Sequence, residues 1–294
     1  EIMPSLVGSE MCIRDRLKQS FPQIVTTKIH LDPRFPISRK MALNVGIKSA
    51  HHECMVFTST DAVPQTDRWL ALMAKGFTRG EIVVGYCGVE RGKGFANYMM
   101  RAWRMMHGVD WIARAVRRNP YRGTLHNIGF TKNIYFGSKG FSHLNMNIGE
   151  DDLYMQKVMT HDNVSVILSP RATLREKTWG GMRWWMGQLR YYGSAFPFYP
   201  QQVKNYIQWE LGSRALFFIT AACALAVMPF EYKIAALVLV LVRYLLVAIQ
   251  VRRIARRLGE AGMAGCYFVY DLLSPLWAFL LGVMLLRRDD RVWR

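Results

Sequence analysis

Apolar residues follow two different patterns along the chain, and the change falls near residue 211. Before it, apolar segments are short and are separated by polar residues. After it come three long apolar runs, at 211–230, 232–250 and 266–286. Each is roughly 18–21 residues long, enough to cross a hydrocarbon core. We therefore predict that 211–294 is a transmembrane region with two or three helices.

A strongly basic segment, "VRRIARRLGEAG" at 251–262, follows the second run. Basic loops stay on the cytoplasmic side, so the first two runs should form a hairpin whose "PFEYK" tip faces outward. Pro275 lies inside the third run, which predicts either a third span or a re-entrant or interfacial element. The alternative is buried helices of a soluble domain, but three such runs leave too little polar surface to cover them.

Two ionisable residues, Arg243 and Asp271, lie inside these runs. Charges at membrane depth are costly, and they either serve a function or pair with one another. We favour a structural explanation, in which Arg243 either snorkels toward the membrane surface or pairs with Asp271, which lowers the cost of burying both.

The segment 17–210 predicts a mixed α/β domain. "RKMALNVGIKSAHH" carries apolar residues at helical spacing, and "ECMVFTST" follows as a buried strand. The predicted order then continues with a turn and a helix, the strand "EIVVGYCGV", a long helix over 94–118 and the strand "NVSVILSP". Alternation of helices and strands predicts a mostly parallel sheet.

The composition of the chain limits the classes of binding partner that we expect. The formal net charge is +18 and 51% of residues are hydrophobic, so acidic partners are expected: nucleic acid, anionic lipid or a phosphorylated substrate. No helix-turn-helix, zinc-finger or RNP-like pattern is present, and much of the basic excess borders the membrane runs, so we do not expect nucleic acid. The five cysteines show no CxxC spacing, which argues against a disulfide framework or a zinc site. Residues 1–16 match no pattern in the rest of the chain, and we expect them to be non-native.

The first candidate site is Asp61 in "VFTSTDAVP", where a buried strand ends. Ligands of open α/β sheets bind beyond the carboxyl ends of strands. A carboxylate there suits a hard metal ion that carries phosphate oxygens. The alternative is an Asp that caps the next helix or begins a turn before Pro64.

The second candidate site is the acidic cluster Glu150, Asp151 and Asp152 in "IGEDDLYMQKV". Carboxylates in the first turn of a helix gain roughly 0.3–1 kcal/mol each from the helix dipole, but capping needs only one of them. Adjacent carboxylates raise one another's pKa, which suits a general base. Catalysis and capping both remain open from these residues alone.

The third candidate site is the aromatic segment "TWGGMRWWMGQLRYYGSAFPFYP". It carries Trp184, Trp185 and Tyr191 beside Gln188 and Arg190. Aromatic rings stack on sugars and bases, and arginine binds phosphate. The alternative is an amphipathic helix at the membrane surface.

Together, "ALNVGIKSA…VFTSTDAVP", "GEDDLYMQKV" and "QLRYY" resemble the family 2 glycosyltransferases, over about residues 17–210. The hydrophobic tail is similar to the membrane-attached members common in Bacteroidetes. The resemblance implies a GT-A (Rossmann-like) fold and an inverting enzyme. Such an enzyme moves a sugar from a nucleotide-diphosphate sugar to a lipid-linked or polysaccharide acceptor during cell-envelope polysaccharide biosynthesis. It further implies Mg²⁺ or Mn²⁺ and the inner membrane of a bacterium, with the catalytic domain facing the cytoplasm.

By the same resemblance, Asp61 is the last aspartate of the DxD motif that holds the metal. Asp151, with Asp152 and Glu150 as close alternatives, is the base that deprotonates the acceptor. Arg190 lies near the diphosphate, Tyr191 takes the aromatic position of QxxRW, and Gln188 and the tryptophans Trp184 and Trp185 contact substrate.

Three departures from the family pattern stand out. Ser59 replaces the first aspartate of DxD. Gly187 stands where the glutamine of QxxRW belongs, so Gln188 is one place late. The nucleotide-base segment is also missing, so we expect a partial GT-A domain, truncated at its N-terminus, whose activity by itself is uncertain. The alternative function is a non-catalytic membrane scaffold or transport subunit with an α/β domain.

Overall fold

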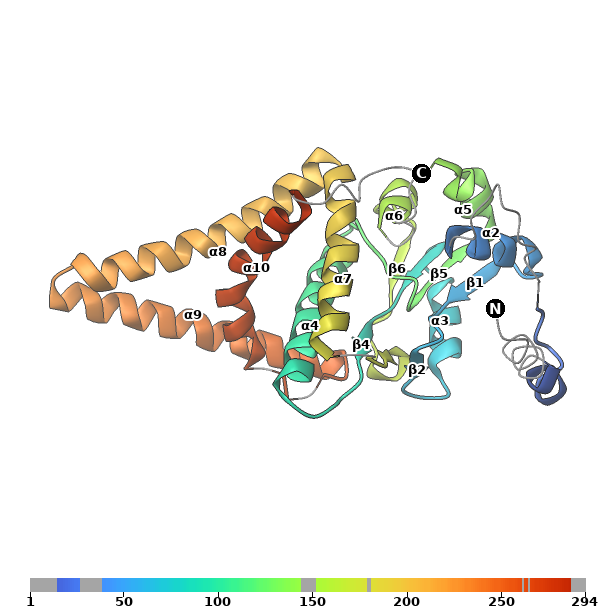
Figure 1. Cartoon of the computed structure of the whole chain (residues 1–294), viewed down its shortest axis with the longest axis horizontal. Helices are drawn as coiled ribbons and strands as arrows, with labels where there is room; N and C mark the ends of the chain where they lie inside the picture. Colours follow the sequence, from blue (N-terminus) through green and yellow to red (C-terminus); the bar gives the residue numbers. More distant parts are fainter. Residues whose placement is uncertain are drawn as a thin grey trace, which may run out of the picture. The chain divides into compact units, whose positions relative to one another are not determined.

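The computed structural model describes residues 15–26, 39–143, 152–178, 181–260, 262–263 and 265–286 (Figure 1). Contacts divide the chain into two units, 1–51 and 52–294. In the first unit, residues 15–20 are helical and α2 spans Arg39–Ser49, which confirms the helix expected there. Most of the segment 1–16, expected to be non-native, lies outside the described residues.

Short strands of the second unit build two sheets. The strands are β1 Cys54–Phe57, β2 Ala62–Pro64, β3 Ile82–Val84, β4 Cys87–Val89, β5 Ile128–Thr131, β6 Val164–Val166 and β7 Leu174–Glu176. One sheet has the order β1-β5-β3-β6, and the other has the order β2-β7-β4. The chain is therefore mixed α/β, as the sequence predicts.

The prediction of a mostly parallel sheet is wrong. Strand β5 pairs antiparallel with both β1 and β3, and only β3 and β6 run parallel in that sheet. In the second sheet β2 and β7 are antiparallel, and β4 and β7 are parallel. The segment "EIVVGYCGV" also divides into β3 and β4, one in each sheet. The mixed order arises because β5 inserts between two strands that helices connect.

Helices pack around these sheets. They are α3 Trp69–Gly76, α4 Phe95–Val116, α5 Lys132–Gly137, α6 Leu153–Val158 and α7 Gly181–Ala195, with 3₁₀ turns at Gly140–His143, Pro170–Ala172 and Phe196–Phe198. The long helix and the helix after the acidic cluster are confirmed as α4 and α6. Helix α4 buries the apolar stripe of its sequence, with Met105 wholly enclosed.

The apolar runs form α8 Gln201–Val227, α9 Phe230–Arg257 and α10 Cys266–Leu286. Helices α8 and α9 make a long hairpin that projects away from the sheets (Figure 1). Both are long and apolar enough to cross a membrane. No described residue of α8 is buried, so its apolar side chains do not serve as a protein core. Helix α10 continues through Pro275 and contacts α4 and α7 as well as α8 and α9.

The base of this hairpin is joined to the sheets by buried charges. Arg175 on β7 donates to the carbonyl oxygens of Leu258 and Gly259, just beyond α9. Glu260 is fully buried and pairs with Arg101 of α4 at 2.7 Å. The basic end of α9 therefore lies beside the α/β part of the chain, and the turn between α8 and α9 lies at the opposite end of the hairpin (Figure 1).

Candidate functional site

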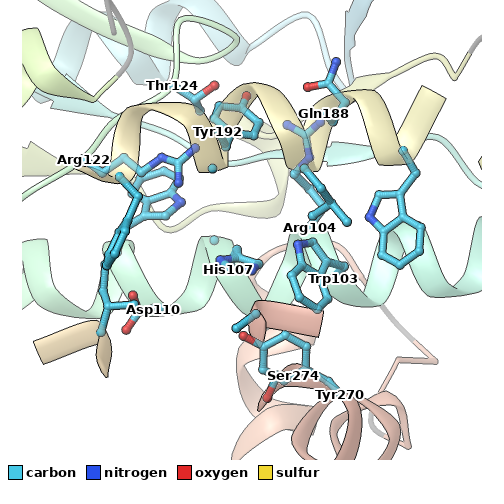
Figure 2. A pocket seen from close by; sticks show the side chains of 18 of the residues that line it. Trp103, Arg104, His107, Asp110, Arg122, Thr124, Gln188, Tyr192, Tyr270 and Ser274 are labelled. Atoms are coloured by element: carbon cyan, nitrogen blue, oxygen red, sulfur yellow. The ribbon is translucent and has the colours of Figure 1, made fainter. Parts of the chain in front are cut away.

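A cavity of about 410 Å³ lies where α4, α7, α8 and α10 meet. In Figure 2, His107 projects from α4, with Arg122 and Tyr192 above it and Ser274 and Tyr270 of α10 below it. Its wall therefore combines residues of the α/β part with residues of the apolar C-terminal helices.

Helical periodicity explains which side chains line the cavity. On α4 the lining residues recur at three- and four-residue spacing, which keeps them on one face. They are Met100, Trp103, Arg104, His107, Gly108, Asp110 and Trp111. On α7 the same spacing selects Trp184, Trp185, Gln188, Leu189, Tyr192 and Gly193. Trp185 is buried and packs edge-on against Trp103, with ring centroids 5.9 Å apart.

The structure divides the residues predicted on the aromatic segment into two groups. Trp184, Trp185 and Gln188 line the cavity, whereas Arg190 and Tyr191 do not, and Arg190 is exposed. Residues two positions apart are rotated by about 200° around the helix axis, so their side chains point to nearly opposite sides of the helix. Because Gln188 is one place late relative to QxxRW, Gln188 and Arg190 cannot share a face.

Of the predicted acidic cluster, Asp152 is described, and Glu150 and Asp151 lie outside the described residues. Asp152 caps α6: its Oδ1 accepts from the backbone N–H of Leu153 at 2.7 Å. Its Oδ2 accepts from the hydroxyl of Tyr199 at 2.6 Å. Tyr199 lines the cavity, so this hydrogen bond joins Asp152, the described member of the acidic cluster, to the cavity wall.

Arg122 supplies a positive charge to the same wall. Its guanidinium lies 4.2 Å from the ring centroid of Tyr192. Its Nε is buried without a hydrogen-bond partner, and no described carboxylate forms an ion pair with it. Burial alone would lower the pKa of Arg122. Nearby groups, first among them Tyr199 and Asp152, outweigh this effect, so the pKa lies above its ordinary value. The charge is therefore retained although it has no direct counter-ion among the described residues.

His107 lies at the centre of the cavity wall (Figure 2). Burial, followed by the charges of Arg122, Arg214 and Arg104, lowers the pKa of His107 to about 3. Its Nε2 is inaccessible and has no hydrogen-bond partner among the described residues. The imidazole is therefore neutral at physiological pH.

A chain of buried polar groups adjoins the cavity at Arg104 and Thr124. Arg104 donates to Glu176 at 2.7 Å, and His126 Nε2 lies 3.4 Å from the other oxygen of Glu176. The ring of His126 continues to the hydroxyl of Thr124, which lines the cavity. Burial raises the pKa of Glu176, but His126 and Arg104 outweigh it and hold the pKa below its ordinary value. The charge of Arg104 is thus balanced.

Asp61, the predicted metal ligand, lies elsewhere. It directly precedes β2, its backbone N–H lies 3.4 Å from Ser59 Oγ, and its carbonyl accepts from Lys177. It does not line the cavity. Across the described residues, no group of three or more His, Cys, Asp or Glu side chains is placed to hold a metal ion. The described residues around Asp61 therefore do not make up a divalent-metal site.

Sequence reasoning missed Arg122, Tyr199 and His107. Tyr199 and Asp152 are 47 residues apart in sequence, and no local sequence pattern predicts that such a pair is in contact. His107 carried a weak signal, because it is a polar residue on the inward face of a helix otherwise rich in Met and Trp.

The chain matches no protein-family model, and no curated protein is significantly similar to it.

Proposed function

We propose that the chain is a membrane-attached inverting glycosyltransferase that moves a sugar from a nucleotide-diphosphate sugar to a membrane-associated or polysaccharide acceptor. One observation carries the proposal: the acidic cluster is joined through Tyr199 to an aromatic cavity bordered by apolar helices. Aromatic walls suit sugar rings. The fold class is compatible with a partial GT-A domain, although the sheets are mixed.

The contacts of Asp152 favour its neighbours as the base. Both Asp152 oxygens accept a hydrogen bond, one at the helix cap and one from Tyr199. Both oxygens of Asp152 are therefore engaged in bonds that hold α6 and Tyr199 in place. We therefore assign Asp152 to positioning, and Asp151, with Glu150 as the alternative, to accepting the proton of the acceptor hydroxyl. The hydroxyl oxygen then attacks the anomeric carbon as the bond to the diphosphate breaks, which inverts the configuration.

Mg²⁺ or Mn²⁺ remains part of the proposal only as a partner of the donor diphosphate. Asp61 is a single carboxylate beside Ser59, and the described residues supply no complete ligand set. No step is therefore assigned to a metal. We expect Asp61→Asn to weaken nucleotide binding if Asp61 contributes one ligand.

Membrane attachment follows from the exposed apolar faces of α8 and α9. Leu239 and Phe230 are 70% and 77% exposed, which is unfavourable in water and favourable in lipid. With Arg252, Arg253, Arg256 and Arg257 exposed at the base of the hairpin, we propose that this end and the α/β part face the cytoplasm of a bacterial inner membrane.

The test is turnover of a panel of nucleotide sugars in lipid nanodiscs. Asp151→Asn should lose roughly 10²-fold or more of the transfer rate. Asp162→Asn, a change at an exposed acid of a surface turn, is the matched control and should behave as wild type.

A scaffold or transport subunit is the second candidate, and the engagement of both Asp152 oxygens in structural bonds favours it. In that case no donor is turned over, and Asp151→Asn and Asp162→Asn behave alike.

A further inference from the structure

Helix α9 ends in a basic face at the base of the hairpin. The exposed residues of this face are Arg252, Arg253, Arg256 and Arg257. At 100° per residue they cover an arc of about 140° around the helix axis. Val251, Ala255 and Leu258 are buried on the opposite side of the helix. Because the buried side fixes the rotation of α9, all four guanidinium groups are directed away from the rest of the chain.

The described residues do not balance the charge of this face. No described carboxylate forms an ion pair with any of the four arginines, and the nearest buried acid in sequence, Glu260, is engaged by Arg101 at 2.7 Å and Arg175 at 3.7 Å. Both i,i+4 pairs within the face bring like charges together, which destabilises an isolated helix. The face therefore favours an anionic partner from outside the described chain.

A second basic segment lies beside this face. The pairing of Arg101 with Glu260 places the first turns of α4 next to the end of α9 (Figure 1). The loop before α4 exposes Arg91, Lys93 and Phe95. Asn97 holds this loop in place, since its side chain donates to the carbonyl of Glu90 and accepts from the N–H of Gly92. Glu90 is also exposed, so residues 90–95 carry one net positive charge. An exposed aromatic ring between basic residues suits the boundary between lipid headgroups and acyl chains.

The apolar length of α9 places its arginines at the edge of a bilayer. From Phe230 to Val251 the helix rises about 30 Å, at 1.5 Å per residue. This length matches the thickness of the hydrocarbon core. If the turn between α8 and α9 lies at one surface of the membrane, Arg252 begins where the headgroups of the other surface begin. The anion that meets the face at this depth is the phosphate of a lipid headgroup.

We propose that the four arginines of α9, together with the loop at 90–95, bind the headgroups of anionic phospholipids on the side of the membrane where the α/β part lies. The planar guanidinium binds a phosphate through two parallel hydrogen bonds. The inference rests on the proposed membrane attachment and not on sugar transfer.

The experiment compares two lipids on the whole chain in a neutral detergent. Phosphatidylglycerol and phosphatidylcholine with identical acyl chains are added in equal amounts, and native mass spectrometry counts how many molecules of each stay bound. We expect phosphatidylglycerol to be preferred roughly tenfold or more, because each arginine near an anionic headgroup strengthens binding roughly fivefold. The preference should fall as salt is added, because exposed charges are screened.

Matched variants locate the surface. The combined change Arg252→Gln, Arg253→Gln, Arg256→Gln and Arg257→Gln should bring the ratio of the two lipids close to one. The control removes four exposed cations around α3 and should keep the preference; its changes are Arg68→Gln, Lys75→Gln, Arg79→Gln and Arg171→Gln. Arg91→Gln with Lys93→Gln should lower the preference roughly two- to fivefold. Glutamine keeps the helix propensity of arginine, and thermal melting checks that each variant is folded. Should the fourfold variant fail to fold, Arg253→Gln with Arg257→Gln provides the same test with a smaller loss.

Equal binding of the two lipids overturns the proposal, as does a control variant that loses as much preference as the four-arginine variant. An unchanged ratio in the Arg91 and Lys93 variant overturns the part assigned to the loop. Glycerol phosphate or a short single-stranded DNA that displaces phosphatidylglycerol at equal phosphate concentration also overturns it, because the face would then take free phosphate or nucleic acid.

Failure of the membrane attachment itself gives a different result. Alkaline carbonate would then extract the wild-type chain from membranes, whereas a chain with inserted helices resists extraction. A chain that resists extraction but shows no lipid preference overturns only this inference. Lipid preference without turnover of a sugar donor leaves the inference standing and overturns the glycosyltransferase.

Discussion

Asp152 and Asp271 are both buried carboxylates, 2% and 0% exposed, but they are stabilised in different ways. Asp271 lies within the apolar helices and has two cations near it: Arg243 at 2.7 Å and Arg214 at 3.6 Å. The hydroxyls of Tyr244 and Tyr267 also donate to it. Asp152 has one backbone N–H and the hydroxyl of Tyr199.

The two carboxylates belong to two clusters of different kinds, which we call closed where the charges form direct ion pairs and open where they do not. Around Asp271 and Glu210, two acids face Arg214 and Arg243, so the charges balance, as burial next to lipid requires. The predicted pairing of Arg243 with Asp271 is confirmed. Around Asp152, Arg122 is held near the carboxylate without an ion pair and faces a cavity. The first cluster pairs its charges in direct contact, whereas in the second the guanidinium and the carboxylate act on each other without an ion pair.

The largest effect is expected from Asp271→Leu. It leaves two arginines without their shared carboxylate, and breaking a buried pair on one side costs about 3–5 kcal/mol. The measurement is thermal unfolding in nanodiscs.

The double variant Arg243→Met, Asp271→Leu is the control, because replacing both partners removes the unpaired charge and should recover much of the stability. A single variant as stable as wild type would show that the cluster is not structural.

A smaller loss is expected from Tyr199→Phe. It removes one of the two described donors of Asp152 and leaves a buried acceptor unsatisfied, a cost of about 1–3 kcal/mol. Tyr206→Phe is the matched control, because it removes the same kind of bond from Asp110, which is only partly buried, so water can replace the lost donor. Equal losses from the two variants would remove the distinction between these carboxylates. Thermal unfolding at neutral pH provides the measurement.

Some features of the fold depend on residues that are close in sequence, and these could be predicted. Others depend on contacts between residues far apart in sequence, and these could not. Helix α4 and the apolar helices follow from periodicity and run length, which are local. Strand β5 was missed although it is as long as β1, whose segment was predicted as a strand. At Gly129 an added Cβ would lie 2.9 Å from the carbonyl oxygen of Met55, so its pairing depends on a contact that no local pattern encodes.

The candidate site divides in the same way. Trp184 and Trp185, which line the cavity, were singled out because aromatic density is visible in sequence, and Gln188 was singled out by the resemblance. Arg122 was missed because its significance lies in having no counter-ion, which only the packed neighbours reveal. Arg190 and Tyr191 were assigned to substrate by resemblance, and a one-residue shift in helix phase turns them away from the cavity.

The pKa of His107 is sensitive to both clusters. Burial lowers this pKa most, and the charges of Arg122 near Asp152 and of Arg214 near Asp271 lower it further. The folded pKa is about 3, and the unfolded value is about 6.5. Between these values the unfolded state binds more protons, so stability falls as pH falls from about 6.5 toward 3. We expect a loss of under about 1 kcal/mol near pH 6 that grows on further acidification.

His107→Gln should flatten this part of the stability curve, measured as melting temperature against pH. Other groups, among them Glu176, also lose stabilisation in acid, so the comparison is between variant and wild type at each pH. Parallel curves would show that His107 does not couple the clusters.

The smallest effect is expected from Tyr267→Phe. Asp271 Oδ1 accepts from Tyr267 at 3.2 Å, but Arg214 approaches the same oxygen and Arg243 and Tyr244 hold the other. A carboxylate with several donors loses little when one is removed, so the cost should be below about 1 kcal/mol. The same hydroxyl deletion at Tyr199 should cost more, and the two unfolding measurements compared directly decide the matter. If Tyr267→Phe proves the more damaging, the cluster around Asp271 is the less complete of the two, and the distinction between a closed and an open cluster weakens with it.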